Sequence, residues 1–426
     1  MKDVLQMLKK ITQHPLMLLL KNNQGNPRIL ILMEPLWGIP FNLIAPFVTL
    51  FMYVQGITDA QIGLILSLGM VAQVCVSFFA GIITDKFGRR TGTIIGDFCG
   101  WSIACLIWMI SNNFWLFLLA TLINSIEQIG GTAWTCLLVE DAEEEDMVGI
   151  FTWVHIGGLI AVFFAPITGF FIARYSLVPV MRTIYGVYVV TMAVKAYLTY
   201  RYCTETKRGV KRMKATKSMR LSEMVLEYKP IIKQMLVDIN LKKVVILNVL
   251  LRVTGLVAST FFGLYITRAL ELPESYLAFF PILNAIVMLV FMIGLQKFLE
   301  RFKIQISMWA GLILLASCQL LLVLIQPQNV VLVVTYVLFM AIGNALIMPR
   351  QGALLQLIID EKERARMLGL IATFTIVLTA PFGYIIGLLS SWNQRLPFIL
   401  ALGFFVIAML IVATIKIQRP SEVSQK

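Results

Sequence analysis

The chain has 426 residues and a formal net charge of +13; hydrophobic residues make up 59% of it and charged residues only 14%. With a mean hydropathy of +0.83 it is far more apolar than a soluble globular domain, so we expect an integral membrane protein. The basic residues are spread over six segments rather than gathered in one patch, which argues against nucleic-acid binding.

The first segment, residues 1–28, is polar and basic. Its longest apolar stretch, Leu16 to Leu20, is too short for the hydrophobic region of a signal peptide. Leu5, Leu8 and Ile11 recur at helical spacing beside lysines, which predicts an amphipathic helix on the inner leaflet. A disordered tail is the alternative.

Twelve apolar stretches follow, each long enough to cross the ~30 Å hydrocarbon core, which takes about 20 helical residues. The predicted spans are 29–53, 60–83, 91–111, 113–138, 148–173, 179–200, 243–268, 275–296, 304–325, 329–357, 367–390 and 396–416.

A basic cytoplasmic linker, residues 201–242, divides these spans into two groups of six. We therefore expect an all-α membrane protein with twelve transmembrane helices in two pseudo-symmetric six-helix halves, at 29–200 and 243–416. Residues 417–426 form a cytoplasmic tail. The halves echo each other, because Ala165-Pro166 in the fifth span has a counterpart in Ala380-Pro381 of the eleventh.

Charge sets the orientation of the spans. Of the 36 Lys and Arg residues, 29 lie in the segments that share one side of the membrane if both termini are cytoplasmic, and four lie on the other side. The six cysteines fall in spans or on the cytoplasmic side, so no disulfide framework is expected. No Cys/His spacing suits a metal, and we expect no cofactor.

A charged turn between the second and third spans carries the most specific signal. Residues 81–90 read Gly-Ile-Ile-Thr-Asp-Lys-Phe-Gly-Arg-Arg, with both signs of charge within one turn. Gly81 would allow two helix ends to approach closely, and Gly88 suits a backbone position with positive φ. Arginines here can reach acids at the end of the fourth span, Glu140 or Asp141.

This turn resembles the loop between the second and third helices of the major facilitator superfamily, Gly-x-x-x-Asp-(Arg/Lys)-x-Gly-Arg-(Arg/Lys). The resemblance implies a gating function for these residues. They are Gly81, Asp85, Lys86, Gly88, Arg89, Arg90, Glu140 and Asp141.

Departures from family subpatterns bear on the substrate. Drug/proton antiporters carry Arg-x-x-Gln-Gly in the fourth helix, where Asn124 to Gln128 stand here, and a fifth-helix Gly-Pro-x-x-Gly-Gly that survives only as Ala165 to Phe170. These differences place membership of that antiporter group in doubt.

Ionisable residues inside spans are functional candidates, because a charge at the bilayer centre costs roughly 2.5 kcal/mol or more unless it faces a cavity or a partner. Glu127, mid-way along the fourth span, is the leading proton-coupling candidate; a structural carboxyl hydrogen-bonded between helices is the alternative. Glu34 in the first span is the second candidate, or else an interfacial anchor for Arg28 or Arg89. Asp97 is read as a partner of the motif arginines.

In the superfamily, helices one, four, seven and ten line the cavity, which implies a set of substrate-cavity candidates. They are Trp37, Phe41, Asn42, Asn124, Gly131, Trp134, Arg252, Asn344 and Arg350. Arg350 lies nearer the cytoplasm and could instead snorkel to it.

The sequence thus predicts a secondary active transporter of a small organic solute, proton-coupled, in a bacterial cytoplasmic membrane, with the substrate, H+ and the lipid bilayer as partners. Hydrophobic drug efflux and a non-transporting receptor or structural partner with the same fold are the alternatives. No catalytic Ser/His/Asp constellation or Walker lysine appears, so an enzyme is not expected. These patterns leave the oligomeric state and the direction of transport open.

Overall fold

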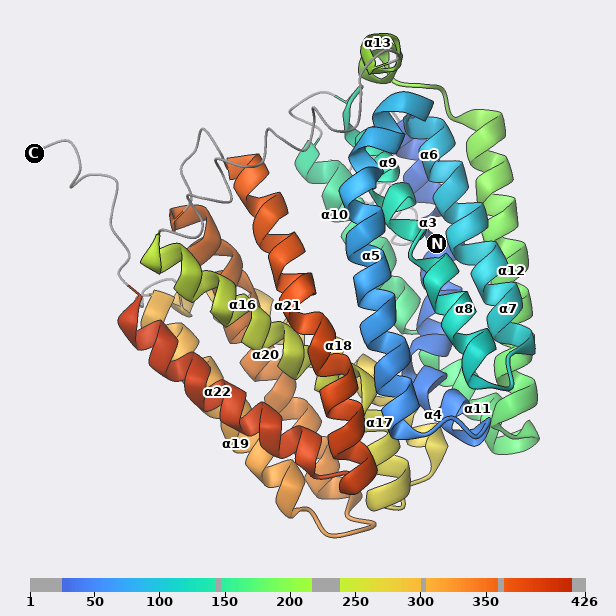
Figure 1. The fold of residues 1–426 in the computed structure, drawn as a ribbon. Helices are drawn as coiled ribbons and strands as arrows, with labels where there is room; N and C mark the ends of the chain where they lie inside the picture. Colours follow the sequence, from blue (N-terminus) through green and yellow to red (C-terminus); the bar gives the residue numbers. More distant parts are fainter. Residues whose placement is uncertain (1–24, 143–146, 217–237, 300–303, 359–363, 416–426) are drawn as a thin grey trace, which may run out of the picture. The chain divides into compact units, whose positions relative to one another are not determined.

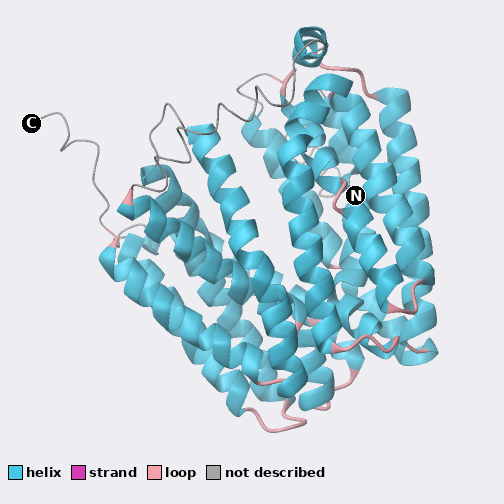
Figure 2. Cartoon of the chain, viewed as in Figure 1, coloured by secondary structure: helices cyan, strands magenta, loops and turns pink. Residues whose placement is uncertain are grey.

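The structure is a computed structural model that describes residues 25–142, 147–216, 238–299, 304–358 and 364–415. Every regular element in these ranges is a helix (Figure 2), which confirms the predicted all-α class. Four segments lie wholly or largely outside the described residues. They are the N-terminal amphipathic helix, the linker from residue 217 to 237, the C-terminal tail, and, of no assigned role, residues 143–146 between the fourth and fifth spans.

The helices are labelled in Figure 1. Their bounds are α3 Asn26–Ile44, η1 Ala45–Phe47, α4 Val48–Val54, α5 Asp59–Phe87, α6 Arg89–Ile95, η2 Gly96–Ile103, α7 Ala104–Ile110, α8 Phe114–Asn124, α9 Glu127–Val139, α10 Met147–Val162, α11 Ala165–Tyr175, α12 Leu177–Tyr202, α13 Lys207–Thr216, α16 Ile239–Thr260, α17 Phe262–Leu264, η4 Tyr265–Ala269, η5 Glu274–Ala278, α18 Phe280–Leu299, α19 Ile304–Leu324, α20 Val330–Ile358, α21 Arg364–Trp392 and α22 Leu396–Thr414.

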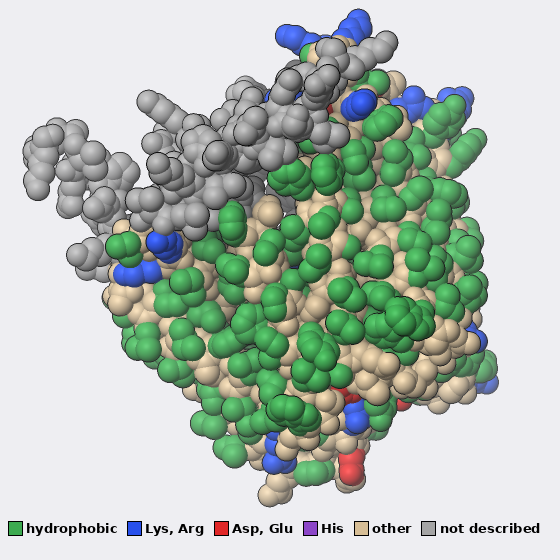
Figure 3. All heavy atoms as spheres, viewed as in Figure 1, with side chains coloured by type: hydrophobic (Ala, Val, Ile, Leu, Met, Phe, Trp, Pro, Cys, Tyr) green, Lys and Arg blue, Asp and Glu red, His purple; other side chains and the backbone are tan. Residues whose placement is uncertain are grey.

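Ten helices in the described part of the chain are long and apolar enough to cross a membrane, or eleven if α16 and the bent stretch after it count as one span. Each of the twelve predicted spans overlaps a helical stretch. Large apolar side chains such as Trp115, Phe170 and Leu410 are exposed on the helix flanks, and Figure 3 shows hydrophobic side chains over most of the visible surface. An exposed apolar surface of this kind suits a lipid environment.

Several spans are interrupted, and the sequence gives the reason for some of the interruptions. The first span contains Pro35 and Pro40, which remove backbone donors, and it passes through the 3₁₀ turn η1 before α4. The fourth span breaks between α8 and α9 at Ser125 and Ile126. The third span contains a π-helix, η2, a form that is frequent at functional sites.

The helices group into two compact units by their contacts. Unit 1 comprises residues 1–45, 75–168 and 175–220, and unit 2 comprises 46–74, 169–174 and 221–426. The helix α5 contributes its first half to unit 2 and its second half to unit 1. The division into halves at 29–200 and 243–416 stays a prediction.

Unit 1 is built around a glycine seam between the third and fourth spans. Gly92, Gly96 and Gly100 are spaced four apart, so they share one face of α6 and η2. A Cβ on Gly96 would lie 2.2 Å from the Cα of Gly130, and one on Gly100 would lie 2.6 Å from the amide nitrogen of Glu127. The two backbones therefore touch, as small residues permit between membrane helices.

The equivalent close contact in unit 2 joins α5 to α21. A Cβ on Gly63 would lie 2.3 Å from the carbonyl oxygen of Gly383 and 2.9 Å from the Cα of Gly387. Ser67 fixes the same contact, because its Oγ accepts a hydrogen bond of 2.7 Å from the amide of Tyr384. The rest of the unit packs an apolar core of α16, α19, α20 and α22.

The glycine seam of unit 1 makes a matched prediction possible at two adjacent residues. Gly130→Ala brings a Cβ to 2.7 Å from the Cα of Gly96, whereas a Cβ on Gly131 meets nothing within 4 Å. Because the obstacle is backbone, the helices must separate, and we expect Gly130→Ala to be less stable by about 1–3 kcal/mol. Thermal unfolding of the purified variants measures this. Equal midpoints for Gly130→Ala and Gly131→Ala would show that the seam does not limit stability.

Candidate functional site

The candidate site in unit 1 is organised by the break in the fourth span. Glu127 is the first residue of α9, and α8 and α9 together form one apolar span, Phe114–Val139, with a two-residue interruption at Ser125 and Ile126 where the backbone stays helical. The break is supported locally: Ser125 Oγ donates to the carbonyl of Leu122 at 2.6 Å, and Asn124 Nδ2 donates to the carbonyl of Gly100 at 2.8 Å. Asn124 thus ties α8 to the π-helix of the third span.

A chain of side-chain hydrogen bonds surrounds the Glu127 carboxyl group. Gln128 Nε2 donates to Glu127 Oε1 at 3.1 Å, and Ser77 Oγ of α5 donates to Gln128 Oε1 at 3.1 Å. The indole of Trp101 in η2 also donates to the Glu127 carboxyl. Three elements therefore converge on this acid, and the two groups that donate to it, Gln128 and Trp101, are uncharged.

An aromatic cluster formed by Trp37, Phe41, Trp101 and Tyr188 adjoins this acid. Trp37 stacks on Phe41 with ring centroids 5.0 Å apart, and Trp101 stacks on Tyr188 at 5.3 Å. Trp37 meets Trp101 edge to face at 6.0 Å. The cluster joins α3, η2 and α12, and Trp101 connects it to Glu127. Planar or sugar-like solutes stack on such rings.

A buried ion pair lies in the same unit. Lys195 of α12 places its Nζ 3.2 Å from Asp97 Oδ1 of η2, and both side chains are more than 90% buried. We expected Asp97 to pair with the arginines of the motif turn, and the pairing with Lys195 shows that this expectation is wrong. The partner of Asp97 is Lys195, which lies 98 residues away in the sequence and is brought close by the fold. Glu34 of α3 is half-buried, and its Cγ lies 3.8 Å from where a Cβ on Gly157 would be.

Three further candidates lie in the first and fourth spans: Asn42, Gly131 and Trp134. Asn42 Nδ2 donates to the carbonyl of Gly38, one turn earlier in its own helix, at 2.8 Å. Gly131 is exposed. Trp134 packs against the apolar cluster that contains Leu30, Leu137 and Ile150. Trp134 therefore belongs to the packed core of unit 1.

The candidates in unit 2 lie on α16 and α20. Arg252 is exposed and Asn344 is half-buried. Arg350 is half-buried, and its Nη1 donates to the carbonyl of Leu346 at 3.0 Å. The sequence analysis missed the neighbouring polar pair, in which the half-buried Gln351 donates from Nε2 to Oδ1 of the buried Asn248.

The motif turn adopts the backbone that its glycine predicted. Gly88 has φ +93°, and its Cβ position would lie 2.4 Å from Glu205 Oε2. Arg89 forms the expected pair with Glu140, Nε to Oε2 at 2.9 Å, and a second pair with Asp85 Oδ1 at 2.9 Å. The expected close approach at Gly81 is wrong for this structure, because Gly81 is exposed with nothing described within 4 Å of its Cβ position.

The linker contributes to this motif cluster, which the sequence analysis did not foresee. Glu205 accepts hydrogen bonds from the backbone amides of Arg89 at 3.0 Å and Arg90 at 3.1 Å, so it caps α6. Thr206 Oγ1 donates to Glu140 Oε2 at 2.5 Å, and Arg212 of α13 donates to Asp85 Oδ2 at 2.7 Å.

The remaining motif residues lie around this cluster. Asp141 is exposed and accepts from the amide of Lys207 at 3.2 Å. The Arg90 guanidinium lies 4.8 Å from the centroid of the Tyr200 ring, and Lys86 is exposed. Figure 3 shows basic side chains on and around α13 at this end of the unit. The start of the linker is therefore docked on the motif, and the gating role stays a prediction.

The Arg89–Glu140 and Arg212–Asp85 pairs of the motif cluster differ in exposure, so they should contribute differently to stability. Arg89 and Glu140 are 4% and 7% exposed, so Arg89→Ala leaves a buried carboxylate with one partner fewer. We expect a loss approaching 3–5 kcal/mol, the usual effect of breaking a buried pair. Arg212 is 46% exposed, and Arg212→Ala should cost about 0–1 kcal/mol. Thermal unfolding of both variants tests this; equal losses would contradict it.

A second ion pair that the sequence analysis missed lies in unit 2. Arg268 Nη1 is 2.9 Å from Asp59 Oδ1, and Ser390 Oγ donates to Asp59 Oδ2 at 2.6 Å. The Arg268 guanidinium lies 3.9 Å from the centroid of the Tyr53 ring. The cluster joins α5, η4 and α21 beside the Gly63 contact. Asp59 precedes the predicted span 60–83 and Arg268 ends the predicted span 243–268, so neither residue stood out in the sequence as a charge inside the membrane.

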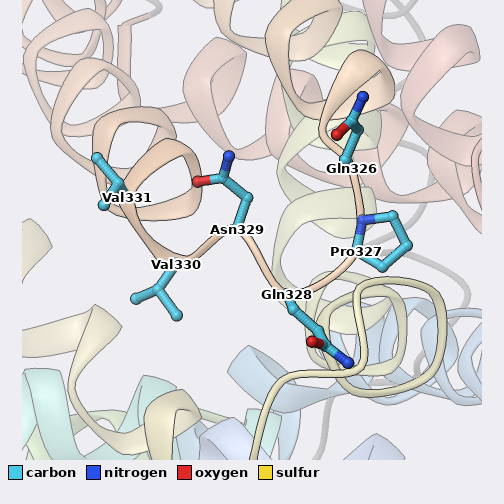
Figure 4. A pocket seen from close by; sticks show the side chains of 6 residues that line it. All are labelled: Gln326, Pro327, Gln328, Asn329, Val330 and Val331. Carbon is cyan, nitrogen blue, oxygen red and sulfur yellow. The ribbon is translucent and has the colours of Figure 1, made fainter.

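A pocket in unit 2 does not coincide with any candidate. It is lined by residues 326–331, which are the loop before α20 and the first two residues of that helix, and their side chains point in different directions (Figure 4). Gln328 in this loop has φ +64°, and its backbone N–H donates to the carbonyl of Leu270 at 2.8 Å. This loop conformation explains the hollow, and the loop carries no ionisable residue.

Comparison with known proteins identifies the family. The family model described as Major Facilitator Superfamily matches residues 36–374 and 257–426. The chain belongs to the major facilitator superfamily. An uncharacterized MFS-type transporter of Bacillus subtilis (strain 168), YqjV, is 28% identical over 155 residues, which are 35% of this chain and 38% of that protein. The matched region therefore spans well under half of that relative's length.

Solved transporters of this superfamily share the fold. A nucleoside transporter, NupG, has a TM-score of 0.67 at 15% identity, covering 92% of this chain and 98% of its own. A D-xylose-proton symporter has a TM-score of 0.70 at 13% identity, covering 91% and 97%. A POT family transporter solved with a peptide conjugate has a TM-score of 0.67 at 14% identity, covering 91% and 95%. This superfamily member is a multi-pass membrane protein of a transporter family.

Some of the site residues that sequence reasoning missed in this superfamily member left a signal. Trp101 follows Gly92, Gly96 and Gly100, and a glycine every four residues marks a helix in close contact with a neighbour. Lys195 is a basic residue inside the predicted span 179–200, and its position there was the available signal. Glu205 had no signal, because a carboxylate in a basic linker is ordinary in composition.

Proposed function

We propose that this chain is a secondary active transporter of a small organic solute, proton-coupled, that works by alternating access in a bacterial cytoplasmic membrane with both termini cytoplasmic. The observation that carries the proposal is the half-buried Glu127 carboxyl group inside the membrane span Phe114–Val139, hydrogen-bonded by Gln128 and Trp101. An ionisable group inside a span is a functional candidate by default.

The surroundings of Glu127 support proton exchange more than a structural role. The partners named for its carboxyl are neutral, Gln128 and Trp101, and neither carries a charge that would hold it permanently ionised. A carboxyl of this kind can be neutral when the site is dry and ionised when water reaches it. Its protonation can then alternate with access to the two sides of the membrane.

The aromatic cluster favours a solute with a planar or ring-shaped part. Trp37, Phe41, Trp101 and Tyr188 place four rings beside Glu127, and Asn124 and Gln128 offer amide groups close by. The solved relatives are named for nucleosides, D-xylose and peptides. A thermal-shift screen of purified protein against these three classes and a panel of hydrophobic drugs identifies the substrate, since bound ligand raises the unfolding midpoint.

Replacing Glu127 by glutamine tests the coupling. With an identified substrate and protein reconstituted in vesicles that contain a pH-sensitive dye, we expect Glu127→Gln to reduce substrate-linked proton flux to the level of empty vesicles. Substrate exchange should persist, because the amide has the shape of the neutral acid. Glu34→Gln should behave in the same way only if the first helix carries the proton.

The exposed acid Glu271, in the loop between η4 and η5, provides the matched control, because Glu271→Gln makes the same substitution away from the site and the motif turn. It should leave proton flux unchanged. Undiminished flux in Glu127→Gln would remove Glu127 from the role. Undiminished flux in both Glu127→Gln and Glu34→Gln would point to another coupling ion.

A further inference from the structure

The buried pair of Lys195 and Asp97 has one carboxylate oxygen unaccounted for. Lys195 Nζ reaches Asp97 Oδ1 at 3.2 Å, and the two side chains are 6% and 9% exposed. The other oxygen, Asp97 Oδ2, is fully buried and has no hydrogen-bond partner among the described residues. An ionised carboxylate accepts several hydrogen bonds, so a buried bare oxygen indicates that it receives a proton or a donor in some state of the protein.

Helix geometry brings Glu34 to the same level as this pair. Trp37, Trp101 and Tyr188 interlock, with ring centroids 6.0 Å and 5.3 Å apart, and so fix the relative heights of α3, η2 and α12. From these rings, Glu34 lies three residues away, Asp97 four and Lys195 seven. At 1.5 Å per residue the offsets of Glu34 and Lys195 are about 4.5 and 10 Å along their α-helices, and Asp97 lies about one turn from Trp101 in the π-helix.

All three offsets run toward the same end of the unit. At that end Asn26 Nδ2, at the start of α3, donates to the carbonyl of Thr204, just after α12, at 2.9 Å. The start of α6 is capped there by Glu205, the next residue. Glu34, Asp97 and Lys195 therefore form one cluster on three neighbouring helices, and both charges of the pair act on the Glu34 carboxyl.

The charges of this cluster do not balance. Two carboxyl groups and one ammonium sum to −1 if all three are ionised, and an uncompensated charge is strongly unfavourable in a buried site. One bound proton makes the cluster neutral. We propose that Lys195 is a counterion shared by Asp97 and Glu34, so that the three side chains together hold one exchangeable proton, separate from the one at Glu127.

Other titratable groups around the cluster do not supply the missing charge. Tyr188, Cys105 and Cys203 are buried and neutral at pH 7; burial raises the pKa of the Cys203 thiol, which lies just beyond the end of α12, to about 11. Arg90 is bound to the carbonyl of Tyr200. Glu127 has its own donors, and the side chain of His155 on α10 lies outside the described set.

As the shared counterion of Asp97 and Glu34, Lys195 has a specific role in transport. This role rests on the proton-coupled function proposed above. While Lys195 pairs with Asp97, as in this structure, Glu34 keeps the proton. When Glu34 releases the proton to water, Lys195 neutralises either carboxylate by rotation of its flexible side chain, and the proton returns from water in the reverse step. Lys195 is thus a positioning residue for the proton.

Infrared spectroscopy tests the sharing directly, because protonated carboxyl groups have a C=O stretching band that carboxylates lack. Protein reconstituted in lipid at neutral pH should have one protonated carboxyl in this cluster. Asp97→Asn and Glu34→Gln should each remove that band, because the remaining acid then pairs with Lys195. The double variant Glu34→Gln/Asp97→Asn should remove no more than either single variant.

Variants of Lys195 should move the band in the opposite direction. Lys195→Met should leave two protonated carboxyls, and Lys195→Met combined with Asp97→Asn should leave one, which also keeps the site neutral if a single variant folds poorly. Glu127→Gln and Asp141→Asn identify the signals of acids outside the cluster. The inference is overturned if Asp97→Asn leaves the Glu34 band intact, or if Lys195→Met adds no protonated carboxyl.

The infrared result needs no substrate, so it is independent of the transport assay. Sharing without any substrate-linked proton flux would overturn the proton-coupled function and leave the shared proton in place. Proton flux without the sharing pattern would overturn this inference alone.

Discussion

The constraint on which the structure depends is that a charge inside a low-dielectric interior must have a partner. Lys195 with Asp97, Arg89 with Glu140, and Arg268 with Asp59 each join segments far apart in the chain. Since hydrophobic matching between helices is weak in lipid, where the tails are as apolar as leucine, such pairs specify which helices are neighbours. The same requirement makes the cluster of Lys195, Asp97 and Glu34, whose charges do not balance, informative about protons.

The glycine seam lets the polar groups of unit 1 meet. Gly96 and Gly130 bring the third and fourth spans into backbone contact, and only at that separation does Trp101 of η2 reach Glu127 at the start of α9. The π-helix and the break at Ser125 follow from the same approach, because Asn124 bonds the carbonyl of Gly100 across the seam. The glycines thus set the distance between the two helices, and the carboxyl, indole and amide side chains provide the ionisable and hydrogen-bonding groups.

Sequence reasoning worked where the signal was local or statistical. Twelve apolar stretches, the positive φ at Gly88 and the pairing of Arg89 with Glu140 were all predicted, since hydropathy and turn chemistry act over short ranges. It did not find the partner of Asp97, because Lys195 lies 98 residues away and neither residue type specifies the other. The helix break at Ser125 and Ile126 also escaped prediction, because no proline or glycine stands there.

The docked start of the linker changes how the motif turn is understood. Two separate features favour glycine at position 88. The backbone there has a positive φ, and a side chain would also collide with the linker, because Glu205 Oε2 would lie 2.4 Å from a Cβ. Gly209 meets the same carboxylate from the other side, with a Cβ position 2.0 Å from Oε1. Thr206, between them, donates to Glu140, which also holds Arg89. Any motion that separates α9 from α6 must therefore break the Arg89 pair and also strain the linker contact at Glu140, so the ends of these helices and the start of the linker are expected to move as one block.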